Sequence, residues 1–158
     1  MSVPPPDRGP GGPGGAPEYV GFWARVGASL VDTIWILPLV VVWLTLVSGG
    51  WRHVTLERVL EWSQSSTEQL LLFAVLALVI VPLWVRRSAT PGKQLIGARI
   101  VDSSTLGPPT SRQLMIRYLG YLLATLPLGV GFLWIAFDPR KQGWHDKLAR
   151  TVVIRVRR

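Results

Sequence analysis

The sequence contains no cysteine, and this absence excludes a disulfide scaffold, a thiolate zinc site and a cysteine nucleophile. It also has few charged residues: they make up 16% of the 158 residues, against about a quarter in a typical soluble domain. Acidic residues are scarcer than basic ones, with 9 Asp and Glu against 17 Lys and Arg, so the formal net charge is +8. The apolar fraction of 49% is too high for a wholly disordered chain. Two classes remain: a compact soluble domain with a basic face, and a small membrane protein with basic loops.

Three long stretches that are almost free of charge decide between these two classes. Residues 69–85 and 118–137 contain no charged side chain, and the only one in 26–47 is Asp32. A helix needs about 20 mostly apolar residues to cross the hydrocarbon layer of a membrane. Helices buried in a soluble protein of this size would keep a polar stripe, whereas the second stretch is apolar on every side. The pattern therefore predicts an all-α integral membrane protein, in preference to a soluble core of three buried helices.

The first 18 residues differ from the rest of the chain in composition. They are rich in proline and glycine, which predicts a disordered, flexible tail before a membrane domain over 19–158. We do not expect a secretory signal peptide, because the tail lacks a cationic segment followed directly by an apolar one.

The distribution of positive charge predicts the orientation. Lys and Arg next to membrane spans stay on the cytoplasmic side, so the basic stretch 86–117 is expected there. The stretch 48–68 is less basic and is expected outside, which places the N-terminus in the cytoplasm. The C-terminal stretch 138–158 is also basic, and a full crossing by the third apolar stretch would leave it outside, against the same rule.

The middle of the third stretch allows both basic stretches to stay on one side. Pro127 and Gly129 can break a helix or turn the chain. Half-helices over about 112–126 and 130–138 would then form a re-entrant hairpin, which membranes tolerate where other protein buries the turn. We expect two transmembrane helices plus this hairpin, and a third full span is the alternative.

Two short segments, 94–102 and 151–157, are rich in β-branched residues and partly alternate between apolar and polar, as strands do. A lone strand leaves its backbone groups unpaired, so each segment is the simplest partner for the other. The sequence therefore predicts a small cytoplasmic β-pair. Pairing requires both segments on one side of the membrane, which again favours the hairpin.

Asp32 is the most informative single residue, because ionisable groups inside a span are costly and usually functional. Arg25 lies two helical turns earlier on nearly the same face, too far away for a direct bond along a straight helix. Each residue therefore needs another partner, and we expect Arg117 for Asp32 and Asp138 for Arg25. The functional interpretation is a proton- or cation-binding carboxylate in a small transport pathway. The alternative is a structural ion-pair network that holds the segments together.

The other motifs predict no catalytic, metal or nucleotide chemistry. The segment 90–93 (T-P-G-K) lacks the first glycine and the final Ser or Thr of a phosphate-binding loop, and we expect Gly92 to make the turn from span to strand. His145 and Asp146 are not expected to bind a metal, because the only other histidine, His53, should lie across the membrane. We recognise no nucleophile–base pair, so we expect no enzyme, no cofactor and no metal. Beside membrane spans, the basic stretches favour anionic lipid headgroups over nucleic acid.

Four segments stand out in order along the chain. They are G-F-W-A-R (21–25) with Asp32 seven residues later, T-P-G-K-Q-L-I-G-A-R-I-V-D (90–102), R-Y-L (117–119) and G-F-L-W-I-A-F-D-P-R-K-Q-G-W-H-D-K-L-A-R-T-V-V (131–153). Together they resemble the RDD family of bacterial membrane proteins over about residues 19–156. The family takes its name from an arginine and two aspartates. Arg25 and Asp32 match the first two, and the later aspartate is Asp138 or Asp146.

The resemblance implies a multi-pass protein of the bacterial plasma membrane. The family is regarded as a candidate for transport of unidentified ligands, and some relatives have been linked to sodium/proton exchange. The candidate functional residues are Arg25, Asp32, Arg117, Asp138, His145 and Asp146.

Two function classes follow. The first is transport or cation/proton exchange with Asp32 as the titrating group; because two or three spans make a poor pathway alone, it implies a homo-oligomer or a partner membrane protein. The second is a non-catalytic membrane scaffold or accessory subunit, whose basic cytoplasmic face binds anionic lipid or a partner protein.

Overall fold

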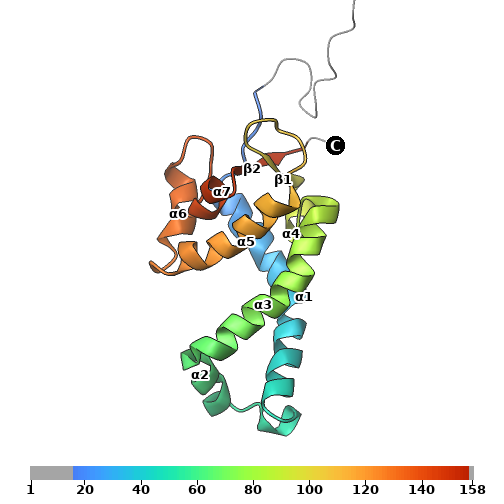
Figure 1. Cartoon of the computed structure of the whole chain (residues 1–158), viewed down its shortest axis with the longest axis vertical. Coiled ribbons are helices and arrows are strands. Elements are labelled where there is room, and N and C mark those ends of the chain that lie inside the picture. The colour runs from blue at the N-terminus through green and yellow to red at the C-terminus, as the bar shows by residue number, and fades with distance from the viewer. Residues whose placement is uncertain (1–15, 157–158) are drawn as a thin grey trace, which may run out of the picture.

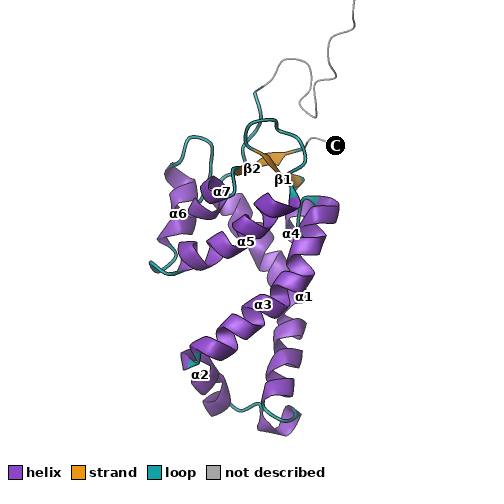
Figure 2. Cartoon of the chain, in the orientation of Figure 1, coloured by secondary structure: helices purple, strands orange, loops and turns teal. Residues whose placement is uncertain are grey.

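The structure, a computed structural model that describes residues 16–156, is mostly helical and contains one small sheet (Figure 1, Figure 2). Its elements in chain order are α1 (Phe22–Val47), a 3-10 turn (Trp51–His53), α2 (Leu56–Gln64), α3 (Ser66–Arg87), α4 (Pro91–Leu95), β1 (Ala98–Asp102), α5 (Ser111–Thr125), α6 (Val130–Phe137), α7 (Trp144–Leu148) and β2 (Thr151–Arg155). The tail predicted over 1–18 lies, apart from residues 16–18, outside the described residues.

In the part of the chain that the structure describes, α1 and α3 are the two helices long and apolar enough to cross a membrane. Their apolar side chains point mostly outward, since only 11% of the most apolar window of α1 and 17% of that containing α3 is buried. Leu30, Ile34 and Leu78, for example, are 67%, 73% and 76% exposed. Long helices that expose most of their apolar surface suit a lipid environment. The predicted stretches 26–47 and 69–85 are therefore confirmed as two long helices.

The third apolar stretch is broken, as predicted. The chain bends by 103° between α5 and α6. Gly129 precedes α6 as its N-cap with a left-handed backbone (φ +79°), a conformation that glycine adopts without steric cost. Beside it, the side chain of Leu128 is 98% exposed, so the tip of the hairpin is apolar and uncovered. The half-helices predicted over 112–126 and 130–138 are confirmed within one residue at each end.

β1 and β2 form an antiparallel pair, which confirms the predicted pairing. Ala98 lies opposite Arg155, and Asp102 lies opposite Thr151. Tyr19 adds a single bridge to β2. Both strands are shorter than predicted, and the first begins later because α4 precedes it. Since β1 comes before the α5–α6 hairpin and β2 after it, both ends of the hairpin return to one sheet.

The sheet packs against α3 and α5 through a continuous apolar core. The buried side chains of this core are Val20, Ile80, Val81, Trp84, Ala98, Ile100, Leu114, Tyr118 and Val153. We call β1, β2, α4 and α7 together the headpiece. Figure 1 shows the headpiece at one end of the molecule and α2 at the other. The core therefore joins the headpiece to one end of the long helices, and their far ends extend away from it.

The stretch 48–68, predicted as a polar loop, contains a short helix, α2. Arg58 on this helix pairs with Glu61 at 3.4 Å and with Glu68 of α3 at 2.9 Å. These ion pairs are partly exposed and stabilise the turn between α2 and α3 only weakly.

Candidate functional site

Asp146 lies at the centre of a buried cluster of charges. Its Oδ2 accepts a hydrogen bond from Nη1 of Arg25 at 2.6 Å, and its Oδ1 accepts one from Nη1 of Arg117. Asp146 is completely buried, and Arg117 is only 1% exposed. Burying charges is costly, and the cost is offset only when each charge finds close partners of opposite sign. We call these three residues the Asp146 cluster.

The Asp146 cluster joins elements that are far apart in the chain. Arg25 comes from the start of α1, Arg117 from α5 and Asp146 from α7. Arg25 also donates through Nη2 to the carbonyl of Lys141 at 2.6 Å, and Arg117 donates to Oγ1 of Thr151, the first residue of β2, at 2.8 Å. The cluster thereby fixes the first long helix, the hairpin and the headpiece to one another.

Asp146 also caps the N-terminus of the short helix α7, because its Oδ2 accepts the backbone N–H of the N-cap residue Gly143 at 3.0 Å. Burial raises the pKa of the Asp146 carboxyl, but the charges of Arg117 and Arg25 outweigh burial and hold the pKa well below its usual range. Asp146 is therefore ionised at neutral pH. Two guanidiniums against one carboxylate leave the cluster with a net charge of +1.

His145 packs beside this cluster. Its ring lies 4.6 Å from that of Tyr121 and 5.2 Å from that of Phe132, and its Nε2 lies 3.4 Å from Oδ2 of Asp146. Gly120 makes room for it, since a Cβ at that position would lie 2.9 Å from the His145 Cα. Burial lowers the pKa of His145 to about 3, so the imidazole is neutral at neutral pH.

Two ion pairs predicted from the sequence are wrong. The sequence predicts that Arg117 pairs with Asp32 and Arg25 with Asp138, whereas both arginines bind Asp146. The physical reason is the position of α7, which packs against α5 and carries Asp146 between the two guanidiniums. A sequence pattern that treats the C-terminal stretch as a solvated basic tail does not reveal this helix.

Asp138, at the end of α6, holds the connection between α6 and α7. Its Oδ1 pairs with Nζ of Lys147 at 2.5 Å, and its Oδ2 accepts the backbone N–H groups of Arg140 at 3.1 Å and Gln142 at 3.2 Å. Burial raises the pKa of Asp138, but Lys147 and these N–H groups outweigh burial and lower the pKa overall. Asp138 therefore stabilises a local turn and does not contact α1 through any of these bonds.

Asp32, on α1, anchors α4. Its Oδ2 accepts a hydrogen bond from the Thr90 hydroxyl at 2.5 Å, and its Oδ1 accepts the backbone N–H of Gly92 at 2.7 Å and the indole N–H of Trp35 at 3.0 Å. Lys93 adds a buried positive charge, with its Nζ 3.4 Å from the Thr90 Oγ1. We call Asp32, Thr90, Gly92 and Lys93 the Asp32 lock, because they hold the segment after α3 against α1.

Gly92 permits the close approach of α4 to α1. A Cβ at this position would lie 2.0 Å from the carbonyl oxygen of Ala28, so no other residue fits without moving the backbone. The prediction that Gly92 makes the turn from span to strand is wrong, because Gly92 lies inside α4 and the turn before β1 is made by Gly97 (φ +67°). Thr90 is the N-cap of α4 and Pro91 its first residue.

The six predicted site residues therefore occupy three places. Four of them lie together as the Asp146 cluster and its neighbour, namely Arg25, Arg117, His145 and Asp146, while Asp32 and Asp138 each lie with other partners. From the sequence, Thr90 and Lys93 were considered only as part of an incomplete phosphate-binding motif, and their part in the Asp32 lock was not predicted. Their position directly after an apolar helix was the signal that could have indicated a structural role. Among residues 16–156, no group of three or more His, Cys, Asp or Glu side chains could hold a metal ion.

The fold and the site define a helical protein of membrane type, whose headpiece is tied to its apolar helices by buried aspartates. The chain belongs to the RDD family, whose model matches residues 19–150. Over 90 residues it is 40% identical to an uncharacterized protein of Rickettsia prowazekii, a match that covers 54% of this chain and 50% of that protein. The chain thus spans about half the length of this relative. No solved structure matches the chain.

We predict that mild acidification destabilises the folded protein through His145. The unfolded chain protonates this imidazole below about pH 6.5, whereas the folded chain does not until the pH reaches about 3. The free energy of unfolding therefore falls as the pH drops through this window, by about 1.4 kcal/mol per pH unit from this one group. Thermal unfolding in a neutral detergent, followed from about pH 7 to about pH 4.5, measures the slope.

The variant His145→Gln should lose most of this slope, and His53→Gln measures the share of the second histidine. Carboxylates whose pKa is lowered in the fold begin to contribute only below about pH 5, at the acid end of this range. An equal slope in the wild type and in His145→Gln would contradict a buried, neutral imidazole.

Proposed function

We propose that the chain is a non-catalytic membrane scaffold or accessory subunit, in which two buried aspartates lock a basic headpiece onto the membrane helices. The observation that supports this most strongly is that both carboxylates are already bonded within the chain. Asp146 is held by Arg25 and Arg117, and Asp32 by Thr90 and Gly92. A carboxylate that binds and releases an ion has to break such bonds, and each broken bond leaves a buried polar group unsatisfied.

A non-catalytic role also fits the chemistry of His145. This residue would be the natural general base of the site, but a base has to accept a proton near the working pH. Burial holds the pKa of His145 at about 3, and the side chain is only 2% exposed. The partners that we propose are anionic lipid at the basic headpiece and, along the exposed apolar faces of α1 and α3, a second copy or a partner membrane protein.

A second candidate function is cation or proton exchange, with Asp32 as the titrating group. The observation that favours it is a chain of three polar groups in the Asp32 lock. The ammonium of Lys93 lies 3.4 Å from the Thr90 hydroxyl, which donates to Asp32 at 2.5 Å. A hydroxyl between a buried cation and a buried carboxylate can relay a proton. Such a pathway would need further polar lining from a homo-oligomer or a partner protein.

The variants Asp32→Asn, Gly92→Ala and Gly27→Ala separate the two functions. Gly92→Ala keeps the carboxylate but forces α4 away from α1, whereas a Cβ at Gly27 meets nothing within 4 Å. The scaffold predicts that the first two variants lower the thermal unfolding temperature in detergent by several degrees. Gly92→Ala overpacks the contact with α1, which costs about 1–3 kcal/mol, and Asp32→Asn removes an acceptor of the buried bonds from Thr90 and Gly92. It predicts that Gly27→Ala unfolds at the wild-type temperature or slightly above it, because alanine favours a helix more than glycine does.

The same proteins are then reconstituted into liposomes of phosphatidylcholine and phosphatidylglycerol, and pH-driven sodium and proton fluxes are recorded. The scaffold predicts a wild-type flux equal to that of protein-free liposomes. A wild-type flux that Asp32→Asn abolishes and Gly27→Ala preserves would reject the scaffold and support exchange.

For the topology, we propose two spans plus a re-entrant hairpin in the bacterial plasma membrane, with both termini cytoplasmic. The support is that β1 and β2 pair directly, although the α5–α6 hairpin separates them in the chain. A hairpin whose two ends return to one sheet begins and ends on one side of any membrane. The basic character of the headpiece favours the cytoplasmic side.

Single cysteines test this topology cleanly, because the natural chain has none. The variants Pro108→Cys and Pro139→Cys flank the hairpin, and Thr67→Cys lies at the start of α3. We expect a membrane-impermeant maleimide to label only Thr67→Cys in spheroplasts and only the two hairpin variants in inverted vesicles. Labelling of Pro108→Cys and Pro139→Cys from opposite sides would contradict the hairpin.

A further inference from the structure

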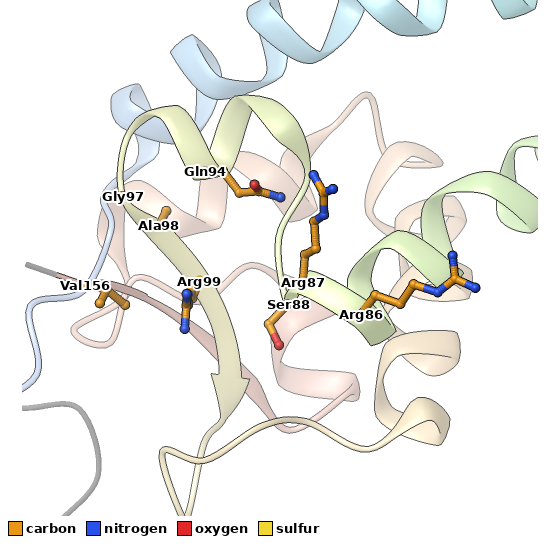
Figure 3. A pocket seen from close by; sticks show the side chains of 8 residues that line it. All are labelled: Arg86, Arg87, Ser88, Gln94, Gly97, Ala98, Arg99 and Val156. Atoms are coloured by element: carbon orange, nitrogen blue, oxygen red, sulfur yellow. The ribbon is translucent and has the colours of Figure 1, made fainter. Parts of the chain in front are cut away.

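A basic groove lies where the end of α3 meets β1. It has a volume of about 350 Å³ and is lined by Arg86, Arg87, Ser88, Gln94, Gly97, Ala98, Arg99 and Val156. Figure 3 shows Arg87 at the end of α3 reaching toward Gln94, Arg99 on β1, and Ser88 between the two arginines, while the side chain of Arg86 points away from Arg99 and has to turn to reach the same ligand. The groove is separate from the Asp146 cluster and the Asp32 lock, because it shares no residue with either.

The arginines of this groove carry charge that is not neutralised within residues 16–156. No described carboxylate pairs with Arg86, Arg87 or Arg99, whereas Arg58, also on the surface, pairs with Glu68 at 2.9 Å. Cations at a helix C-terminus stabilise the helix, which accounts for Arg86 and Arg87 as the last residues of α3. It does not account for Arg99, which comes from a strand. Three exposed guanidiniums around one groove point to an anionic ligand.

The walls of the groove are held by backbone hydrogen bonds. The N–H of Ile100 in β1 donates to the carbonyl of Ser88 at 2.7 Å, and the N–H of Val156 donates to the carbonyl of Gly97 at 2.7 Å. The end of α3 and the sheet are thereby fixed to each other. Only the long arginine side chains need to move when they close on a ligand, and this limits the entropy lost on binding.

The position of the groove identifies the source of the anion. Arg86 and Arg87 directly follow the apolar part of α3, where a span leaves the hydrocarbon and enters the headgroup layer. Apolar side chains adjoin the groove in sequence on both sides: Val85 is 49% exposed and Leu95 is 73% exposed. A soluble anion gains nothing from contact with these apolar side chains, whereas a phospholipid can place its acyl chains against them.

We propose that this groove binds the phosphate of an anionic phospholipid headgroup, with Arg86, Arg87 and Arg99 as its ligands. The guanidinium fork matches phosphate oxygens in pairs, and the Ser88 hydroxyl can donate a further bond. The inference names the lipid partner of the scaffold and rests on that proposal for the membrane placement of α3. The two proposals can fail separately, because the groove and the flux are measured by different experiments.

The test uses the full chain in a neutral maltoside detergent. Dioleoylphosphatidylglycerol, dioleoylphosphatidylcholine or inorganic phosphate is titrated in, and the apparent Kd is taken from the rise in unfolding temperature. We expect a saturable rise with phosphatidylglycerol and none with phosphatidylcholine. Each arginine removed near a membrane surface weakens binding about fivefold, so Arg99→Gln should raise the Kd about fivefold and Arg86→Gln/Arg87→Gln about 25-fold.

Arg112→Gln is the matched control, because it removes a positive charge that is also exposed, from the start of α5, outside the groove. It should leave the Kd within about twofold of the wild type. Arg99→Gln and Arg112→Gln should unfold at the wild-type temperature without lipid. The shift of each variant is measured from its own lipid-free unfolding temperature, which separates binding from folding. Wild-type affinity in Arg99→Gln, or an equal loss in Arg112→Gln, would overturn the site. Equal shifts from inorganic phosphate and phosphatidylglycerol would overturn the lipid as its source.

Discussion

The structure depends on one constraint, the complete burial of the Asp146 carboxylate. A buried charge without partners is too costly to persist, so Arg25 and Arg117 have to reach it from α1 and α5. This requirement places α7 against α5 and within reach of Arg25 on α1. It also sets β2, which begins at Thr151 within hydrogen-bond distance of Arg117, beside β1. A helix of five residues thereby determines where the hairpin and the headpiece lie relative to α1.

The Asp32 lock supplies the second fixed point. The two long helices bury little of their apolar surface, so their mutual position depends on the segments at one end. Gly92 and Thr90 hold the chain that leaves α3 against Asp32 on α1. Asp32 lies seven residues after the nearest arginine, Arg25, and Asp146 lies on the separate short helix α7. Together these two aspartates connect the headpiece to the helices. Because the Asp146 cluster and the Asp32 lock each fix a different part of the structure, both buried acids are retained in an otherwise apolar chain.

The sequence predicted those features that depend on local composition. Stretches almost free of charge predicted α1 and α3, Pro127 and Gly129 predicted the break between α5 and α6, and β-branched segments predicted the two strands. The partners of the aspartates could not be predicted, because they depend on the packing of α7, whose five residues carry too little periodicity to recognise. The role of Gly92 was missed for a similar reason, since its close contact with Ala28 joins positions 64 residues apart.

The most direct test of the central claim is a double-mutant cycle on Arg25 and Asp146. Arg25→Gln, Asp146→Asn and the double variant are compared with the wild type by chemical unfolding in detergent. Asp146→Asn leaves the buried guanidiniums of Arg25 and Arg117 without their carboxylate, so we predict a loss of about 3–5 kcal/mol. Arg25→Gln leaves Asp146 paired with Arg117 and should lose less. The double variant should lose less than the sum, with a coupling energy of about 1–3 kcal/mol. Losses that add within about 0.5 kcal/mol would contradict the claim that this pair holds the structure together.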